Sequence, residues 1–238
     1  MTGDDTFLFL KINDMDVNKI SEQLLLAVKM EEPTTSLVEE LANVSFGDLR
    51  DTLTTDTHKK AFWINAYNAY FQILRKEQHV DKPAIYKERL VEIAGQKLSL
   101  DDIEHGILRQ GKFKEGAAPP ILLRNLIEEL MVATVDYRIH FSLNCGAKSC
   151  PPIAFYSVEK LEQQLEMATI GFLESETDIL TDKKEAHVTA LFNWFEEDFG
   201  GKTGVLAILA EKLNVNMEGF QLVYKEYSWE EDLGNFVV

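Results

Sequence analysis

The strongest constraint on the fold is a long apolar segment of helical character, roughly residues 57–78. It contains the run KKAFWINAYNAYFQILRKE, in which apolar side chains fall on most sides of a helix and the charged ones gather at its ends. A helix that is hydrophobic nearly all round is buried in the core of a protein instead of lying on its surface. The sequence therefore predicts a core helix here.

The remaining periodicities predict an α+β fold, mostly helical, with one small and mainly antiparallel sheet. Apolar residues recur at helical spacing in 20–28 and 37–44, and Ser99, three residues before Asp102, predicts the cap of a helix that Gly111 ends. Further helices are expected at 121–134, 157–174, 191–199 and 205–213. Strands are expected in a hairpin at 90–93 and 97–98, and at 136–143, 187–189 and 220–224.

Charge and motif content exclude several classes of function. The net charge is −16, so nucleic acid is not expected as a partner, because a polyanion needs a basic surface. No apolar run approaches the roughly 18–20 residues that span a membrane, and the acidic start does not resemble an export signal. A cytoplasmic protein is therefore expected, although removal of a signal would leave the same picture. Nucleotide-binding, nucleophile-elbow and zincin motifs do not occur, so we expect no cofactor.

The segment 138–152, RIHFSLNCGAKSCPP, is the most informative about chemistry. A predicted strand carries His140 into a glycine-containing loop with Cys145 and Cys150. Thiol catalysis needs a thiolate, an imidazole that takes and returns a proton, and backbone N–H donors for the developing oxyanion. On an ideal strand His140 and Asn144 share one face and Cys145 faces the other way, so spacing alone does not choose between the two thiols.

Three other interpretations of the same residues stay open. The two cysteines could be small buried packing residues, which is common for free cysteine. They could bind a metal with His140 and a fourth ligand such as His105 or Glu104, but the spacing does not fit common zinc patterns. A disulfide between Cys145 and Cys150 is possible in an exported chain and disfavoured in a reducing cytosol.

Polar residues in two other segments complete the candidate site. Glu104 lies beside the apolar stripe of its predicted helix and could orient His140 as the third member of a triad, or it could be a solvated surface residue. Asn65 and Asn68 lie on one face of the core helix and need hydrogen-bond partners, so we expect them to hold the backbone of a neighbouring loop. The aromatic residues Phe192, Trp194, Phe195 and Phe199 are expected to pack in the core, with Asp198 at the end of their helix.

Several ordered motifs resemble those of the family known as domain of unknown function 547. They are FWINAYN at 62–68, LSLDDIE at 98–104, RIH at 138–140, LNCGAKSCPP at 143–152 and FNWF at 192–195 with DFG at 198–200. The resemblance covers about 57–200, flanked by N-terminal helices in 1–56 and a C-terminal helix and strand in 201–238, and we expect 1–238 to form one domain. The family's C-terminal Trp-x-Leu-Asn pattern is altered here, from Trp229 onward.

The resemblance implies a relation to papain-like and transglutaminase-like cysteine enzymes, with Cys145, His140 and Glu104 as the triad. Some members carry Ser at the position of Cys150, which favours Cys145 as the nucleophile. Asn65, Asn68, Asn144, Gly146 and Cys150 would support the site, and Gly146 would lie among the oxyanion donors. The expected function is cysteine-dependent hydrolysis or acyl transfer on an amide or thioester, in a small molecule or a peptide. The alternative is a non-catalytic interaction module in which the same residues stabilise a loop.

Overall fold

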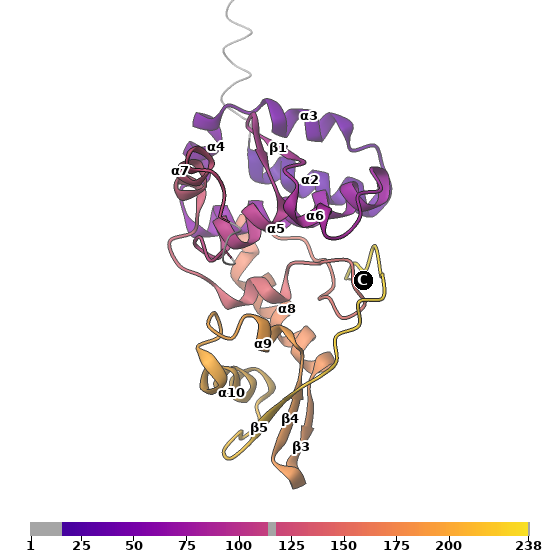
Figure 1. Ribbon diagram of the computed structural model, residues 1–238, viewed down its shortest axis with the longest axis vertical. Coiled ribbons are helices and arrows are strands. Elements are labelled where there is room, and N and C mark those ends of the chain that lie inside the picture. Colours follow the sequence, from indigo (N-terminus) through magenta and orange to yellow (C-terminus); the bar gives the residue numbers. More distant parts are fainter. Residues whose placement is uncertain (1–15, 114–117, 238) are drawn as a thin grey trace, which may run out of the picture.

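The computed structural model describes residues 16–113 and 118–237 of the chain. The acidic N-terminal start discussed above lies outside the described residues. Figure 1 shows an upper part that is mainly helical and a lower part in which two helices lie beside a small sheet. The α+β class expected from the sequence is confirmed. No helix in the described residues is long and apolar enough to cross a membrane.

The predicted core helix is α5 (Asp56–Gln72), which continues as a π-helical turn, η1 (Ile73–Glu77). Every residue of α5 from Lys60 to Gln72 is buried. Thr55 caps its start, because the Thr55 hydroxyl accepts a hydrogen bond from the backbone N–H of His58. Helix α2 (Val17–Met30) packs against α5, and both contribute to the larger of two hydrophobic clusters.

The other elements of the upper part surround α5 (Figure 1). They are α3 (Thr35–Asn43), α4 (Phe46–Thr52), α6 (Ala84–Lys87), the antiparallel hairpin β1 (Val91–Ile93) and β2 (Gln96–Leu98), the π-helical η2 (Asp102–Leu108) and α7 (Ile121–Leu130). The cap predicted at Ser99 is present: the Asp102 N–H donates to Ser99 Oγ, and the Ser99 N–H donates to Asp102 Oδ2, both at 3.0 Å.

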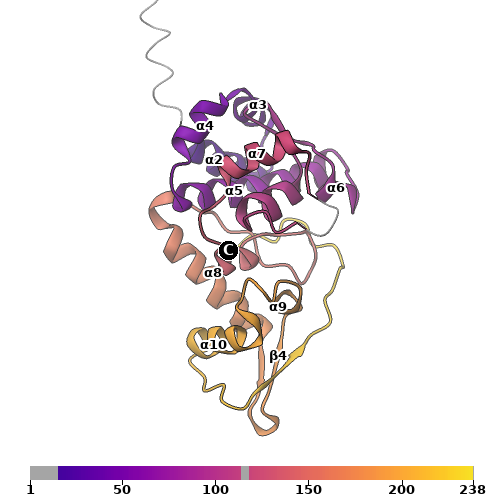
Figure 2. The same cartoon turned by 60° about the vertical axis from the view of Figure 1, so that its left-hand side comes forward.

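The lower part begins with a short 3-10 turn, η4 (Val158–Lys160), and helix α8 (Leu161–Glu176), which runs from the upper to the lower part in Figure 2. A three-stranded sheet follows, with the order β3 (Asp178–Leu180), β4 (Glu185–Val188) and β5 (Gln221–Tyr224). Strand β4 pairs antiparallel with β3 and parallel with β5. Helices α9 (Leu191–Trp194) and α10 (Gly201–Leu213) pack beside this sheet around the second hydrophobic cluster, which is rich in phenylalanine.

The strand predicted at 136–143 is wrong. Residues Tyr137–Phe141 form a 3-10 helix, η3, that the Asp136 carboxylate caps by accepting from the Arg138 N–H at 3.1 Å. The backbone N–H groups of Ile139 and Ser142 bond within the segment instead of to a neighbouring strand. Residues 139–144 are all buried, so the polar side chains of the alternating pattern lie as deep as the apolar ones, and the pattern does not mark a solvent-facing side. The argument from strand faces about His140 and Cys145 therefore does not apply.

The helix predicted at 191–199 is also shorter than expected, since α9 ends at Trp194. The chain then turns, with the Gly201 N–H bonded to the Glu196 carbonyl, and Gly200 adopts a φ of +76° that favours glycine. This turn places Asp198 in the interior instead of at the end of the predicted helix, whereas Trp194, expected in the core, is 45% exposed.

After β5 the chain returns to the upper part and runs beside the loop that carries both cysteines (Figure 1). The Lys148 N–H donates to the Glu230 carbonyl at 2.8 Å, and the Ile153 N–H donates to the Asn235 carbonyl at 2.7 Å. This C-terminal segment, residues 225–237, thus forms one wall of the candidate site.

Candidate functional site

A pocket of about 200 Å³ lies where the upper part, the lower part and the C-terminal segment meet. All three predicted triad residues line it, and so does the second cysteine. Aromatic side chains make up much of the wall. The lining residues are Tyr67, Tyr86, Glu104, His105, His140, Leu143, Cys145, Cys150, Pro151, Leu191, Trp194, Phe195, Tyr227 and Trp229.

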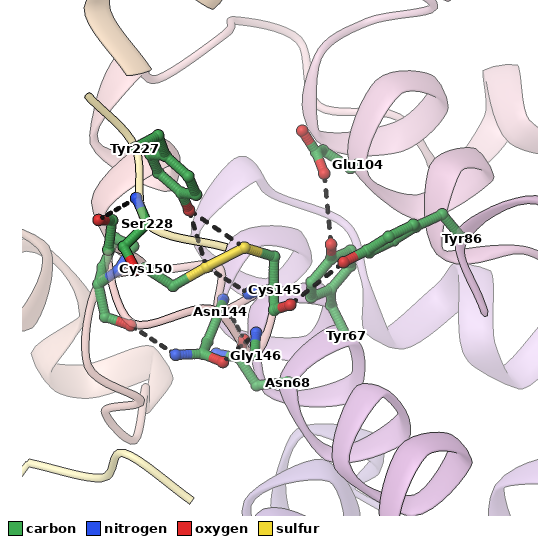
Figure 3. The surroundings of a disulfide bond; sticks show 12 residues. Tyr67, Asn68, Tyr86, Glu104, Asn144, Cys145, Gly146, Cys150, Tyr227 and Ser228 are labelled. Atoms are coloured by element: carbon green, nitrogen blue, oxygen red, sulfur yellow. Dashed lines mark hydrogen bonds between the residues drawn. A yellow bond between two sulfur atoms is a disulfide. The ribbon is translucent and has the colours of Figure 1, made fainter. Parts of the chain in front are cut away.

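The two cysteines of the loop are joined by a disulfide, with Cα atoms 6.0 Å apart. Figure 3 shows this bond with the Tyr227 hydroxyl close to both sulfur atoms. Cys145 is half-buried, whereas Cys150 is only 4% exposed. The disulfide left open by the sequence is therefore the state seen here, and the thiolate that catalysis requires would form only after reduction.

Buried amides hold this loop in place (Figure 3). Asn68 donates from Nδ2 to the Ser142 carbonyl and accepts from the Asn144 N–H, both at 2.9 Å. The Asn144 side chain in turn accepts from the Gly146 N–H at 2.8 Å and donates to the Pro151 carbonyl at 2.8 Å. The loop is thus tied to the core helix at its start and to itself across both cysteines.

Position 146 requires glycine, both because of its backbone conformation and because of its close neighbours. Its φ is +67°, and a Cβ added there would lie 2.5 Å from the ring of Phe71. Its N–H is bonded to Asn144, so the oxyanion role suggested for this donor would need that bond to break. The N–H of Cys145 points instead to Cys150 Sγ at 3.1 Å and faces the sulfur atoms directly.

Asn65, one turn before Asn68, holds a different segment. It donates to the Tyr156 carbonyl at 2.7 Å and accepts from the Tyr156 N–H at 3.0 Å. Tyr156 lies just beyond the cysteine loop and is fully buried. The two helix amides therefore fix the backbone on both sides of the candidate site.

His140 is buried and paired with a carboxylate from a distant turn. Its Nε2 lies 2.9 Å from Asp198 Oδ2, and its ring stacks on Phe195 with centroids 4.0 Å apart. Burial lowers the pKa of His140, although the bond to Asp198 and the charge of Glu104 act in the opposite direction, so the imidazole is neutral at pH 7.

Asp198 contacts His140 outside the pocket lining, and its side chain is 0% exposed. It contacts Arg109 Nε at 2.5 Å and Lys112 Nζ at 2.8 Å in addition to His140. Burial alone would raise the pKa of Asp198, but these three hydrogen bonds outweigh it and hold the pKa well below its usual range. An ionised carboxylate can only accept, so Nε2 of the neutral His140 carries the proton and Nδ1 is the basic nitrogen.

Glu104 lines another part of the pocket. The Tyr67 hydroxyl donates to Glu104 Oε2 at 3.4 Å (Figure 3). Glu104 Oε1 lies 3.6 Å from His105 Nδ1. Its negative charge contributes to raising the pKa values of Tyr67, Tyr86 and Tyr227, for which burial is the largest cause. The Glu104 carboxylate therefore forms part of the pocket wall.

Sequence reasoning missed several residues of this site. The sequence pattern places Asp198 only at the end of a helix and gives Tyr227 no role. Trp229 marked only the departure from the family pattern. Asp198 meets Arg109, Lys112 and His140, which lie 89, 86 and 58 positions away in the chain, and no local spacing signals that meeting.

The two cysteines are not available as thiolate ligands for a metal in this structure, because their sulfur atoms are bonded to each other. Among residues 16–113 and 118–237, no group of three or more His, Cys, Asp or Glu side chains is arranged to hold a metal ion. The predicted trio does converge on one pocket, together with Asp198 behind His140.

Comparison with known proteins identifies one family. A family described as "Protein of unknown function, DUF547" matches residues 51–173, just over half of the 238 residues. The match includes Glu104, His140 and both cysteines, and it ends before Asp198 and Tyr227. No curated protein and no solved structure matches the chain. The chain belongs to the DUF547 family of proteins of unknown function.

Proposed function

We propose that the reduced protein is a cysteine-dependent hydrolase or acyl-transfer enzyme. The observation that supports this most directly is that Cys145, His140 and Glu104, drawn from three separate segments, line one pocket. Cys145 is the more exposed of the two cysteines, so it is the sulfur assigned to attack. In a reducing cytoplasm, the location expected from the sequence, the thiol form would prevail.

His140 serves as the base through Nδ1, since Nε2 is committed to Asp198. Asp198 takes the orienting role expected of Glu104: it fixes the ring and the tautomer and stabilises the imidazolium that forms. Glu104 adds negative charge at the pocket wall. The proton moves from Cys145 to His140 as sulfur attacks the carbonyl carbon, and it returns to the leaving amine or thiol.

The substrate is an amide or a thioester carried by a small molecule or a peptide. A pocket of about 200 Å³ has room for a small acyl group and not for a folded partner. Tyr86, Trp194 and Trp229 offer apolar faces to such a group. The relation to papain-like enzymes remains part of this proposal.

Alkylation of the reduced protein tests the proposal. We expect iodoacetamide to modify Cys145 at pH 7 at least tenfold faster than an ordinary thiol, and we expect His140→Gln to remove most of this advantage, because positioned bases contribute about 10²–10⁴-fold. His187→Gln is the matched control: His187 Nε2 lies 3.0 Å from Glu185 Oε2 but does not line the pocket. Thermal unfolding of each variant checks that it is folded.

The second candidate is a non-catalytic interaction module. It is favoured by the hydrogen bonds of Asn68 and Asn144 and by the disulfide, which together would suffice to hold a binding loop. In that case both thiols would react at ordinary rates, and the His140→Gln and His187→Gln variants would be indistinguishable. This result would contradict the enzyme proposal.

A further inference from the structure

The two sulfur atoms of the disulfide have different surroundings. Among the described residues, Cys150 Sγ has two hydrogen-bond donors, the Cys145 N–H at 3.1 Å and the Tyr227 hydroxyl at 3.0 Å. Cys145 Sγ has only the Tyr227 hydroxyl, at 3.2 Å. Cys145 is also the more exposed residue. Exposure and hydrogen bonding therefore distinguish the accessible sulfur of Cys145 from the buried sulfur of Cys150, which has two hydrogen-bond donors.

Tyr227 must be the donor, with its single proton shared between the two sulfur atoms, because the sulfur atoms of a disulfide carry no proton. Burial is the main cause that raises the pKa of Tyr227, so the hydroxyl keeps its proton at neutral pH. A disulfide sulfur is a weak acceptor, whereas a thiolate is a strong one. The same hydroxyl would therefore bind the thiolate produced by reduction much more strongly than it binds the disulfide.

The position of the hydroxyl is held from two sides. The Tyr227 ring packs against Trp194 and Trp229, with centroids 4.7 Å away in each case. The next residue, Ser228, donates from its N–H to Ser149 Oγ at 3.0 Å, within the cysteine loop (Figure 3). Because the C-terminal segment is bonded to the loop itself, the hydroxyl stays beside the sulfur atoms in either oxidation state.

The pocket gives a small molecule access to the disulfide. Both cysteines line it, and two other lining residues, Trp194 and Trp229, are 45% and 58% exposed. The pocket therefore opens to solvent at this aromatic side. A compact thiol fits the volume of about 200 Å³.

We propose that this pocket carries out thiol–disulfide exchange with a small thiol, with Cys145 as the attacked sulfur, Cys150 as the leaving thiolate and Tyr227 as the hydrogen-bond donor that stabilises it. The incoming thiolate, whose proton goes to water, bonds to Cys145 Sγ while the Cys145–Cys150 bond breaks and its electron pair stays on Cys150. A second thiolate attacks the sulfur of the bound thiol and releases Cys145 as a thiolate. Two thiols are thereby oxidised to one disulfide, and the cysteine pair gains two electrons.

Both observations select the same direction of attack. Exchange is faster at the accessible sulfur, and it is faster when the departing sulfur is the more acidic one. The inference is independent of the hydrolase proposal, since His140 takes no part in it. If both hold, exchange generates the Cys145 thiol that the hydrolase needs.

The first test locates the attacked sulfur in the unaltered full-length chain. The protein, oxidised with a mild thiol oxidant, is treated with reduced glutathione, and the reaction is stopped early with acid and N-ethylmaleimide. Peptide mass spectrometry then shows which cysteine carries glutathione and which carries maleimide. We expect glutathione on Cys145 at least tenfold more often than on Cys150.

The second test removes the donor. Tyr227→Phe deletes only the hydroxyl, and we expect glutathione to open the disulfide of this variant about three- to tenfold more slowly. Tyr224→Phe is the matched control, because its hydroxyl lies three residues away in the same part of the chain and contacts no hydrogen-bond partner among the described residues. This variant should open at the rate of the unaltered protein.

Three results would overturn the inference. They are glutathione found equally or preferentially on Cys150, a disulfide that opens only in denaturant, and equal opening rates for Tyr227→Phe and Tyr224→Phe. The mapping experiment needs no variant, so a poorly folded Tyr227→Phe does not leave the direction of attack undecided. Neither test uses iodoacetamide reactivity or His140, so a negative result for thiol–disulfide exchange would not contradict the hydrolase proposal.

Discussion

Replacement of Asn68 by alanine should destabilise the protein strongly, because this amide joins the core helix to the cysteine loop. Asn68 is 0% exposed, and its two hydrogen bonds, to the Ser142 carbonyl and from the Asn144 N–H, are both 2.9 Å long. The variant leaves both backbone groups buried without their partner. Each such group costs about 1–3 kcal/mol, so we expect a loss of about 2–6 kcal/mol in the free energy of unfolding. This is a large share of the ~5–15 kcal/mol typical of folded proteins.

Urea denaturation, followed by far-UV circular dichroism, measures this loss. Both proteins are kept in the disulfide form, so that the oxidation state of the loop is the same. Asn193→Ala is the control: Asn193 is an exposed residue of α9, and its replacement should change the free energy of unfolding by less than about 0.5 kcal/mol. A loss below about 1 kcal/mol for Asn68→Ala would refute the reasoning, since it would mean that the loop does not depend on this amide.

Two further predictions concern stability. Gly146→Ala should lower the free energy of unfolding by at least about 2 kcal/mol, because alanine is strained at a φ of +67° and its Cβ would meet Phe71. Gly171→Ala, in open space within α8, should raise it by about 0.5–1 kcal/mol. Thermal unfolding compares the two variants. Burial would raise the pKa of Asp136, but hydrogen bonds from Arg138 and Lys60 lower it to about 2, against 3.8 when unfolded. Its ionised form therefore contributes about 2 kcal/mol above pH 4, which is lost as the pH falls toward 2, and unfolding measured from pH 6 to 2 should show a shallower acid decline in Asp136→Asn. An unchanged decline in that variant, or a Gly146→Ala protein as stable as Gly171→Ala, would contradict these accounts.

Part of the candidate site could be predicted from the sequence, because the residues that determine its conformation are neighbours in the chain. The run around Asn65 and Asn68 requires a buried helix with partners for its amides, and the loop from Asn144 to Pro152 is irregular because of its glycine and prolines. The Ser99–Asp102 cap likewise depends on a spacing of three residues. In each case the residues that decide the structure are close together in the chain.

The sequence could not specify the strand or helix character of residues 136–143, because tertiary contacts bury the polar side chains of His140 and Ser142, which the alternation places on a solvent-facing side. It also could not show that Asp198 would meet His140, since α9 ends early and the following turn carries the carboxylate inward. The charge balance at that point depends on Arg109 and Lys112, which come from another segment.

The sequence by itself determined the α+β class, the buried helix and the loop that carries the two cysteines, since these follow from periodicity, capping and turn residues within short windows. Only the tertiary structure decided which carboxylate holds His140, that the sulfur atoms are joined and that the Tyr227 hydroxyl lies against both. The physical reason is that these contacts join residues up to 82 positions apart. Such contacts depend on the path of the whole chain, and no local propensity encodes that path.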